Sequence, residues 1–216
     1  MRQKTKAEKL KQISDEVFNL KKSPLYEYRN QNNYYPVLGE GNHDAEVMFV
    51  GEAPGVNEAK QGKPFCGAAG KVLDKLFESI AMDRKSVYIT NIVKDRPPSN
   101  RDPASDEIAI YAPFLMRQIE IIQPKIIVTL GRISMAIVFQ EFGLHEKLQT
   151  IGKMHGRVFD AEMPYENINP PKFRNAKLRR VKIVVLYHPA VGTYNPNTID
   201  VMKQDFQIIK KLIGKK

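Results

Sequence analysis

Two side chains that can take part in acid–base chemistry each follow a largely apolar run in this 216-residue chain. Glu52 lies in the segment Val-Gly-Glu-Ala-Pro-Gly (50–55), directly after the run 46–50. His188 lies in Tyr-His-Pro-Ala (187–190), directly after the run 181–186. Such runs are typical of parallel strands, and ligands gather beyond the carboxyl ends of those strands. We therefore expect a carboxylate and an imidazole at the rim of one site, as an acid–base pair.

Hydrophobic periodicity predicts the elements that must position these two residues. We expect strands at 46–51, 86–91, 125–130 and 181–187, and a β-like, loopy stretch at 148–160. We expect helices at 4–22, 68–82, 106–122, 132–141 and 197–213. Strands that alternate with helices predict an α/β fold, in three α/β/α layers around a largely parallel central sheet. Because no linker divides the chain, we expect residues 1–216 to form a single domain, with a helical N-terminal appendage (1–38) and an insertion loop (161–180).

Three further motifs lie between the two ends of the expected site. Gly-Lys-Pro-Phe-Cys-Gly-Ala-Ala-Gly occupies 62–70, Thr90-Asn91 closes the run 86–89, and Arg-Pro-Pro-Ser-Asn-Arg occupies 96–101. In this order and context, the five motifs resemble those of the uracil-DNA glycosylase superfamily, and most closely its family 4. The resemblance runs from about Gly39 to the last helix, and it implies a uracil-DNA glycosylase-like fold.

The resemblance implies a monofunctional DNA repair glycosylase that hydrolyses the N-glycosidic bond of deoxyuridine in DNA, which releases uracil and leaves an abasic site. Asn91 would read the N3–H and O4 edge of uracil, because an amide offers both a donor and an acceptor. Phe65 would stack on the flipped base, and Gly51 and Ala53 would contact it. His188 would donate to O2 as negative charge grows there.

Each of these assignments has a simpler structural alternative. Glu52 would orient or activate water, or would stabilise the cationic sugar, and its alternative is a solvated loop residue. Asn91 could be a turn or cap residue, Phe65 a core residue, and His188 a histidine whose hydrogen bonds are satisfied at a strand end. The ordered set of motifs favours the functional interpretation in each case.

A formal charge of +10 and a pI of about 9.5 suit a polyanionic partner. The expected DNA-binding residues lie in two loops: Arg96, Pro97, Ser99 and Arg101 in the first, and Pro189 and Tyr194 in the second. Tyr194 is the candidate wedge for the space that the flipped base leaves. Basic residues within 172–182 would either contact phosphates or act as a solubilising charge run.

Family 4 enzymes usually hold a [4Fe–4S] cluster on four cysteines. By resemblance, the four ligand positions are here about Leu20 and Ser23, then Asp95 and Tyr111, and none is Cys. Because such a cluster needs about four thiolates and Cys66 is the single cysteine, we expect no cluster, no other metal and no organic cofactor. We expect apolar and aromatic packing in the cluster's place, from Leu20, Leu25, Tyr26, Tyr28 and Tyr111, and Cys66 as a small buried hydrophobe.

We expect an intracellular monomer that acts on uracil-containing DNA in the cytoplasm or nucleoid, without membrane contact. The sequence has one cysteine, no apolar run of about 20 residues and no signal-peptide pattern. Three alternatives stay open: a glycosylase for hypoxanthine or xanthine, a DNA-binding relative without catalysis, and a general nucleotide-binding α/β protein. The last is disfavoured, because neither glycine-rich phosphate-binding motif is present.

Overall fold

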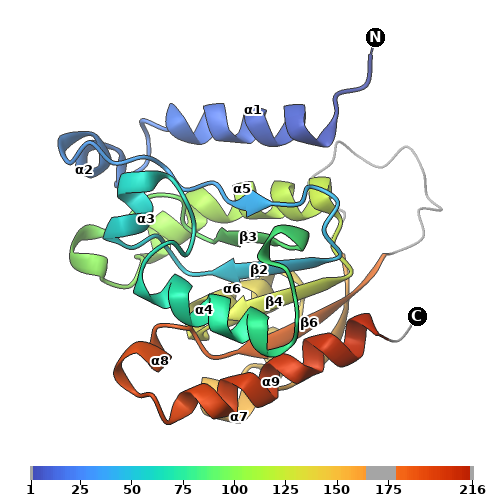
Figure 1. The fold of residues 1–216 in the computed structure, drawn as a ribbon. Coiled ribbons are helices and arrows are strands. Elements are labelled where there is room, and N and C mark those ends of the chain that lie inside the picture. Colours follow the sequence, from blue (N-terminus) through green and yellow to red (C-terminus); the bar gives the residue numbers. More distant parts are fainter. Residues whose placement is uncertain (1, 164–178, 215–216) are drawn as a thin grey trace.

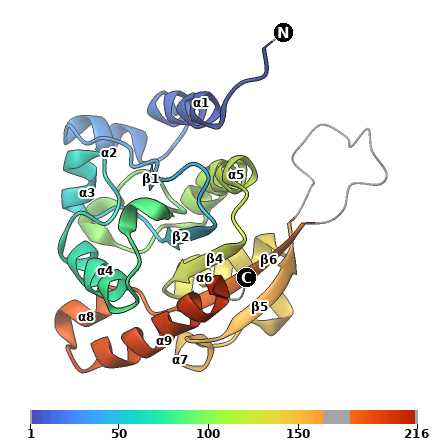
Figure 2. The ribbon, with the colours of Figure 1, turned by 45° about the vertical axis from the view of Figure 1, so that its right-hand side comes forward.

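A six-stranded sheet forms the centre of the computed structural model, which describes residues 2–163 and 179–214 (Figure 1). In spatial order its strands are β1 (Glu40–Gly41), β3 (Tyr88–Asn91), β2 (Val47–Gly51), β4 (Ile126–Leu130), β6 (Arg180–Leu186) and β5 (Val158–Glu162). β3, β2, β4 and β6 are parallel to one another, whereas β1 and β5 pair antiparallel at the two edges. Figure 2 shows β5 beside β6 at one edge. The predicted, largely parallel sheet is confirmed.

The central strands are buried on both faces, because their side chains alternate between two hydrophobic cores. In β2, Met48 and Val50 belong to one core, while Val47 and Phe49 belong to the other. All five residues of β2 and all five of β4 are buried. This explains why both strands read as continuous apolar runs in the sequence.

Helices cover both faces of the sheet and complete the three layers (Figure 1). α5 (Ser105–Ile122) and α6 (Arg132–Glu141) cover one face, and α1 (Lys6–Phe18) packs against α5. α4 (Ala68–Ser79) and α9 (Thr198–Ile213) cover the other face. There the rings of Phe49, Phe77 and Phe206 pack against one another at centroid distances of 5.0 to 6.0 Å.

Short helical turns connect these elements, and the sequence periodicity did not predict them because each spans too few residues to show a repeat. They are α2 (Tyr26–Gln31), α3 (Val56–Gln61), α7 (Ile151–Met154) and α8 (Val191–Tyr194), with 3₁₀ turns η1 (Arg84–Ser86), η2 (Pro98–Asn100) and η3 (His145–Lys147). α3 and α8 each follow one of the motifs directly, and η2 lies within the motif 96–101.

The first helix and the insertion loop are among the elements whose expected boundaries differ in the structure. The first helix ends at Phe18 instead of residue 22, because Asn19 caps it and the chain then turns. The insertion loop is shorter than 161–180, since β5 extends to Glu162 and β6 begins at Arg180. Residues 164–178 of this loop, including the basic Lys172, Arg174 and Lys177, lie outside the described residues.

None of the helices in the described part of the chain is both long enough and apolar enough to cross a membrane.

Candidate functional site

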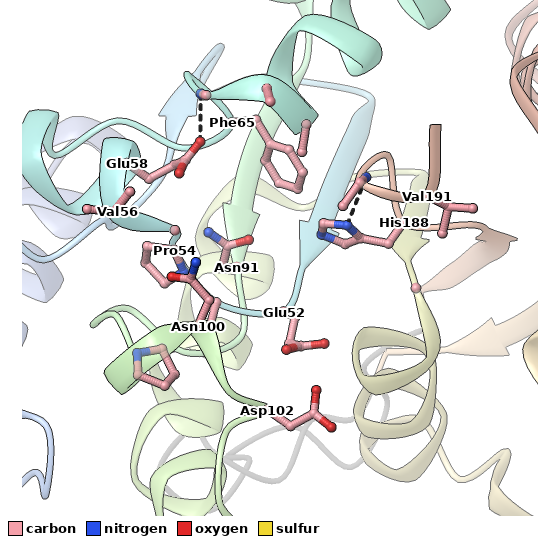
Figure 3. A pocket seen from close by; sticks show the side chains of 18 of the residues that line it. Glu52, Pro54, Val56, Glu58, Phe65, Asn91, Asn100, Asp102, His188 and Val191 are labelled. Carbon is pink, nitrogen blue, oxygen red and sulfur yellow. Dashed lines mark hydrogen bonds between the residues drawn. The ribbon is translucent and has the colours of Figure 1, made fainter. Parts of the chain in front are cut away.

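A cavity of about 680 Å³ opens at the carboxyl ends of the parallel strands (Figure 3). Glu52 enters it from the end of β2, Asn91 from β3, Gly131 from β4 and His188 from β6. Phe65 enters from the loop before α4. Residues that are up to 136 positions apart in the sequence therefore meet at one sheet edge, as the strand-end motifs predicted.

Asn91 is the last residue of β3, and its strand partner is Gly51, the last residue of β2. The absence of a side chain on Gly51 makes room for two neighbours. A Cβ atom there would lie 2.3 Å from Oδ1 of Asn91 and 2.7 Å from Cζ of Phe65. Asn91 is 2% exposed, so its amide is held in a confined space beside the Phe65 ring. A ring with an amide at its side suits the recognition of a flat heterocycle.

The backbone around Phe65 is unusual and closely fitted. Phe65 has a φ of 49°, in the left-handed region that non-glycine residues rarely occupy. A Cβ atom on Gly70 would lie 1.8 Å from the Phe65 carbonyl oxygen, so only glycine fits in this turn of α4. The Glu58 carboxylate accepts a hydrogen bond of 2.7 Å from the backbone N–H of Gly67 and fixes the loop from the α3 side. Strained backbone that its surroundings enforce is typical of binding sites.

The hydrogen bond from the backbone N–H of Ala190 to Nδ1 of His188, 3.2 Å long, fixes the tautomer of this imidazole. Because Nδ1 accepts, the single proton of the neutral ring lies on Nε2, which can donate into the cavity. Burial lowers the pKa of His188 to about 4, although the Glu58 carboxylate acts in the opposite direction. The ring is therefore a neutral donor near pH 7, and it lies 5.7 Å from the Phe65 ring, centroid to centroid.

Glu52 lies at the other end of the cavity and faces a second carboxylate, that of Asp102 (Figure 3). Burial raises the pKa of Glu52, and the negative charge of Asp102 raises it further. Arg132, which follows the end of β4, lowers it and forms an ion pair with Asp102. A half-buried carboxylate with a raised pKa is a candidate general base.

Lys94, three residues after Asn91, is completely buried, although a lysine in a strand-end loop is usually solvated. Its Nζ donates to the carbonyl oxygen of Asn91 (2.5 Å), to Oε1 of Gln118 (2.6 Å) and to Oγ1 of Thr90 (2.9 Å). Burial lowers the pKa of Lys94 well below its usual value. These three bonds anchor the end of β3, and Lys94 itself does not line the cavity.

The residues expected to contact DNA fall into two groups. Pro97, Arg101 and Tyr194 line the cavity mouth, and Tyr194 is 73% exposed. Arg96, Ser99 and Pro189 do not line it: Ser99 lies exposed in η2, and Pro189 is buried.

Both arginines of the first loop have partners within the protein. Arg96 donates to the hydroxyl groups of Tyr28 (2.9 Å) and Tyr34 (3.3 Å). The guanidinium of Arg101 forms two hydrogen bonds with the buried Glu107 carboxylate, 2.5 and 2.8 Å long. Both side chains are therefore held in place by the protein itself.

Sequence reasoning missed Glu58, Asp102 and Arg132 as cavity residues. A signal existed for Glu58, which is the acidic residue in the first turn of the helix after the glycine-rich strand end. A signal also existed for Arg132, which follows a strand end just as Glu52 does. Asp102, in an exposed loop, carried no signal.

The positions that the resemblance assigns to iron–sulfur ligands do not fit a cluster. Of the residues expected to pack there, Leu20, Leu25 and Tyr111 are buried in one hydrophobic core. In addition, the Tyr111 hydroxyl is hydrogen-bonded to both Ser23 and Asp95 in the interior, a polar contact that the expected packing did not include. The described residues contain no group of three or more His, Cys, Asp or Glu side chains that could hold a metal ion. Cys66 is partly exposed instead of buried.

Comparison with known proteins identifies similar sequences over most of the chain. Residues 38–210 match the model of the uracil DNA glycosylase superfamily. The chain is 43% identical over 204 residues to the type-4 uracil-DNA glycosylase of Sulfurisphaera tokodaii, and the matched region covers 94% of this chain and 84% of the relative. It is 40% identical over 209 residues to the type-4 uracil-DNA glycosylase of Archaeoglobus fulgidus, and the matched region covers 97% of this chain and 96% of the relative.

Proposed function

Because the chain belongs to the uracil DNA glycosylase superfamily, we propose that it hydrolyses the N-glycosidic bond of deoxyuridine in DNA and leaves an abasic site. One observation carries the proposal: Asn91, Phe65 and His188 meet in one cavity of base-binding size. This arrangement supports the flipping of a nucleotide out of the helix and the recognition of its base by an aromatic face and an amide.

Departure of the base is the step in which His188 acts. As the C1′–N1 bond breaks, the electron pair stays on the base, and negative charge develops at O2. The neutral imidazole donates its Nε2–H to that oxygen, and the Ala190 N–H keeps the other nitrogen an acceptor. A donor that is already oriented stabilises this charge without reorganisation.

Attack by water on the sugar is the step in which Glu52 acts. The sugar acquires positive character as the base leaves, so a carboxylate nearby stabilises it and accepts a proton from the attacking water. The raised pKa of Glu52, which follows from burial and from Asp102, makes it a stronger base than an exposed glutamate.

Double- or single-stranded DNA approaches the cavity mouth. The net charge of +10 favours association, and Arg96, Pro97, Ser99 and Arg101 would contact the backbone. Tyr194 and Pro189 belong to the second loop, in which the exposed Tyr194 ring would fill the space of the flipped base. We expect a monomer that acts wherever the genome lies.

The test is incubation of the purified protein with single- and double-stranded oligonucleotides that each carry uracil, hypoxanthine, xanthine or only normal bases. Alkali then cleaves at abasic sites. We expect cleavage at uracil. Cleavage at hypoxanthine or xanthine alone would assign a different base, and no cleavage at stoichiometric enzyme would refute the proposal.

Two variants make this assay specific to the chain. His188→Ala, purified in the same way, excludes a contaminating host enzyme, because its activity must fall if the protein itself is responsible. His145→Ala alters an exposed histidine outside the cavity, and it should cleave like the unmodified protein.

A further inference from the structure

A buried chain of hydrogen bonds joins the N-terminal segment to the loop that follows β3. The Tyr111 hydroxyl donates to Oδ2 of Asp95 at 2.5 Å, and it lies 2.8 Å from Oγ of Ser23. Nη1 of Arg29 donates to both oxygens of Asp95, at 3.0 and 3.2 Å. We call these four residues, Ser23, Arg29, Asp95 and Tyr111, the Asp95 network.

The direction of each hydrogen bond in the Asp95 network can be assigned. Because Tyr111 gives its hydrogen to Asp95, Ser23 must donate to Tyr111, and Ser23 in turn accepts from the backbone N–H of Leu25 (3.1 Å). Both oxygens of Asp95 accept, so Asp95 is the ionised partner of Arg29. The Arg29 and Asp95 side chains are 4% and 0% exposed, so their charges are paired away from water.

Arg29 extends the Asp95 network to the first helix. Its guanidinium donates to the backbone oxygen of Val17 (3.2 Å) and to that of Phe18 (2.5 Å), at the carboxyl end of α1. Its Cζ also lies 4.9 Å from the centroid of the Tyr26 ring. Cations are favoured at helix carboxyl termini and over aromatic faces, so these contacts stabilise the buried guanidinium of Arg29.

Three of the four members of the Asp95 network are significant for another reason. Ser23, Asp95 and Tyr111 occupy positions that the family resemblance assigns to cysteine ligands of an iron–sulfur cluster. Here their oxygen atoms are committed to one another and to Arg29, and no buried side-chain polar atom of the described residues lacks a partner. Nothing in this region is free to bind iron.

We propose that the Asp95 network is a metal-free positioning device for the loop 95–102, at positions that the resemblance assigns to cluster ligands. Asp95 begins the loop, and four of the next seven residues, Pro97, Asn100, Arg101 and Asp102, line the cavity mouth. Arg96 ties the same loop to the N-terminal segment a second time, through Tyr28 and Tyr34. The network thus holds the expected DNA-contacting surface in its binding conformation.

Tyr111→Phe is the first test, because it keeps the ring but removes the hydroxyl that joins Ser23 to Asp95. We expect amide hydrogen exchange within 96–102 to accelerate by about tenfold, as expected when a buried hydrogen bond that restrains a loop is lost. On the proposed function, the KM for uracil-containing DNA should rise by a similar factor while the rate at saturating DNA stays within about twofold.

Phe206→Leu is the matched control. Phe206 packs on the opposite face of the sheet, so this variant lowers global stability without touching the Asp95 network. Its exchange within 96–102 and its KM should stay like those of the unmodified protein at temperatures well below unfolding. If both variants changed these quantities equally, the Asp95 network would be only a contribution to stability.

Asp95→Asn is the second variant, because it keeps the shape but removes the charge opposite Arg29. It should shift the same two quantities further than Tyr111→Phe, and in the same direction. Unchanged exchange within 96–102 in a folded Tyr111→Phe protein would overturn the proposal. If the unmodified protein did not cleave uracil-containing DNA, the exchange measurement would still decide the role of the network, so the two failures are distinguishable.

Discussion

A Cβ atom on Gly51 would lie 2.3 Å from Oδ1 of Asn91, its partner in the neighbouring strand. The end of β2 therefore forms the floor on which the Asn91 amide and the Phe65 ring are placed. Real Cβ atoms do not approach an oxygen this closely, so any larger residue must displace one of the two side chains.

Gly51→Ala should reduce the single-turnover rate on uracil-containing DNA by roughly 10²-fold, the usual cost of a misplacement near 1 Å. The φ of Gly51 is outside the left-handed region, so alanine there would clash with neighbouring side chains but would not strain the backbone. Gly152→Ala is the control, because its nearest neighbour, the Tyr187 hydroxyl, would be 3.8 Å away. A Gly51→Ala protein of normal rate would show that neither side chain needs its present position.

Asn91→Asp should lower uracil release by at least about 10³-fold and admit cytosine weakly, since a mismatched hydrogen-bond edge is penalised strongly. In this buried position the acid favours its protonated form, which donates to N3 of cytosine and accepts from its amino group. Oligonucleotides with uracil or cytosine at one site measure both rates. Asn91→Leu, which offers neither group, should release neither base, and an unchanged uracil rate in Asn91→Asp would make Asn91 a structural residue.

Sequence reasoning predicted the cavity because the site obeys a local rule. Glu52, Asn91 and His188 each follow a recognisable apolar run, and the carboxyl ends of parallel strands meet at one edge. The fold was predictable for the same reason, since buried strands and amphipathic helices each produce a characteristic local pattern of apolar residues in the sequence. Phe65 was identified through the resemblance of the motif 62–70, in which it lies.

Burial of charge could not be predicted in the same way. Lys94 and Arg29 would each be placed at the surface by composition alone, but both are buried. Their partners are set by tertiary structure: Asp95 lies 66 positions from Arg29, and Gln118 lies 24 positions from Lys94. The count of cysteines showed that thiolates are missing from the ligand positions. It did not predict that an ion pair and two hydroxyl groups form a hydrogen-bonded network at these positions.

The purified protein should be colourless and active without iron. Thiolate-ligated clusters absorb near ~400 nm, and the ligand positions here hold oxygen groups bonded to one another. An absorbance spectrum, with iron and acid-labile sulfide analysis, measures this directly. Prolonged treatment with a chelator should leave the cleavage rate unchanged, whereas stoichiometric iron and sulfide would contradict the prediction.

His188→Ala should lower the single-turnover rate by roughly 10²–10³-fold and leave DNA affinity nearly unchanged, because its bond to O2 strengthens only as the base becomes an anion. Rates at saturating enzyme and an equilibrium binding titration separate the two quantities. Since burial lowers the pKa of His188 to about 4, the unmodified protein should show no change in rate at pH 6.5 that depends on this residue. A variant that lost mainly affinity would make His188 a binding residue instead of a leaving-group stabiliser.

Glu52 should set the acidic limb of the rate profile. Burial and Asp102 raise the pKa of Glu52, so its carboxylate becomes protonated at a higher pH than that of an ordinary glutamate. Because the protonated acid cannot act as the base, the rate should fall as the pH drops through that raised pKa. The ionised Glu52 carboxylate favours catalysis but destabilises the fold, because a pKa that is raised in the folded state lowers the free energy of unfolding at neutral pH. Glu52→Gln should therefore raise the melting temperature at pH 7, while it lowers the rate by roughly 10²-fold or more.

Two neighbouring variants test whether the acidic limb belongs to Glu52. Asp102→Asn removes a cause that raises the pKa of Glu52, so the limb should move to lower pH. Arg132→Gln removes the cause that lowers it, so the limb should move to higher pH. Single-turnover rates between about pH 4 and 8 measure all three proteins, a range that spans the ordinary pKa of glutamate and neutral pH. A limb that stayed in place in both variants would assign it to another group and leave Glu52 an electrostatic role toward the sugar, without proton transfer.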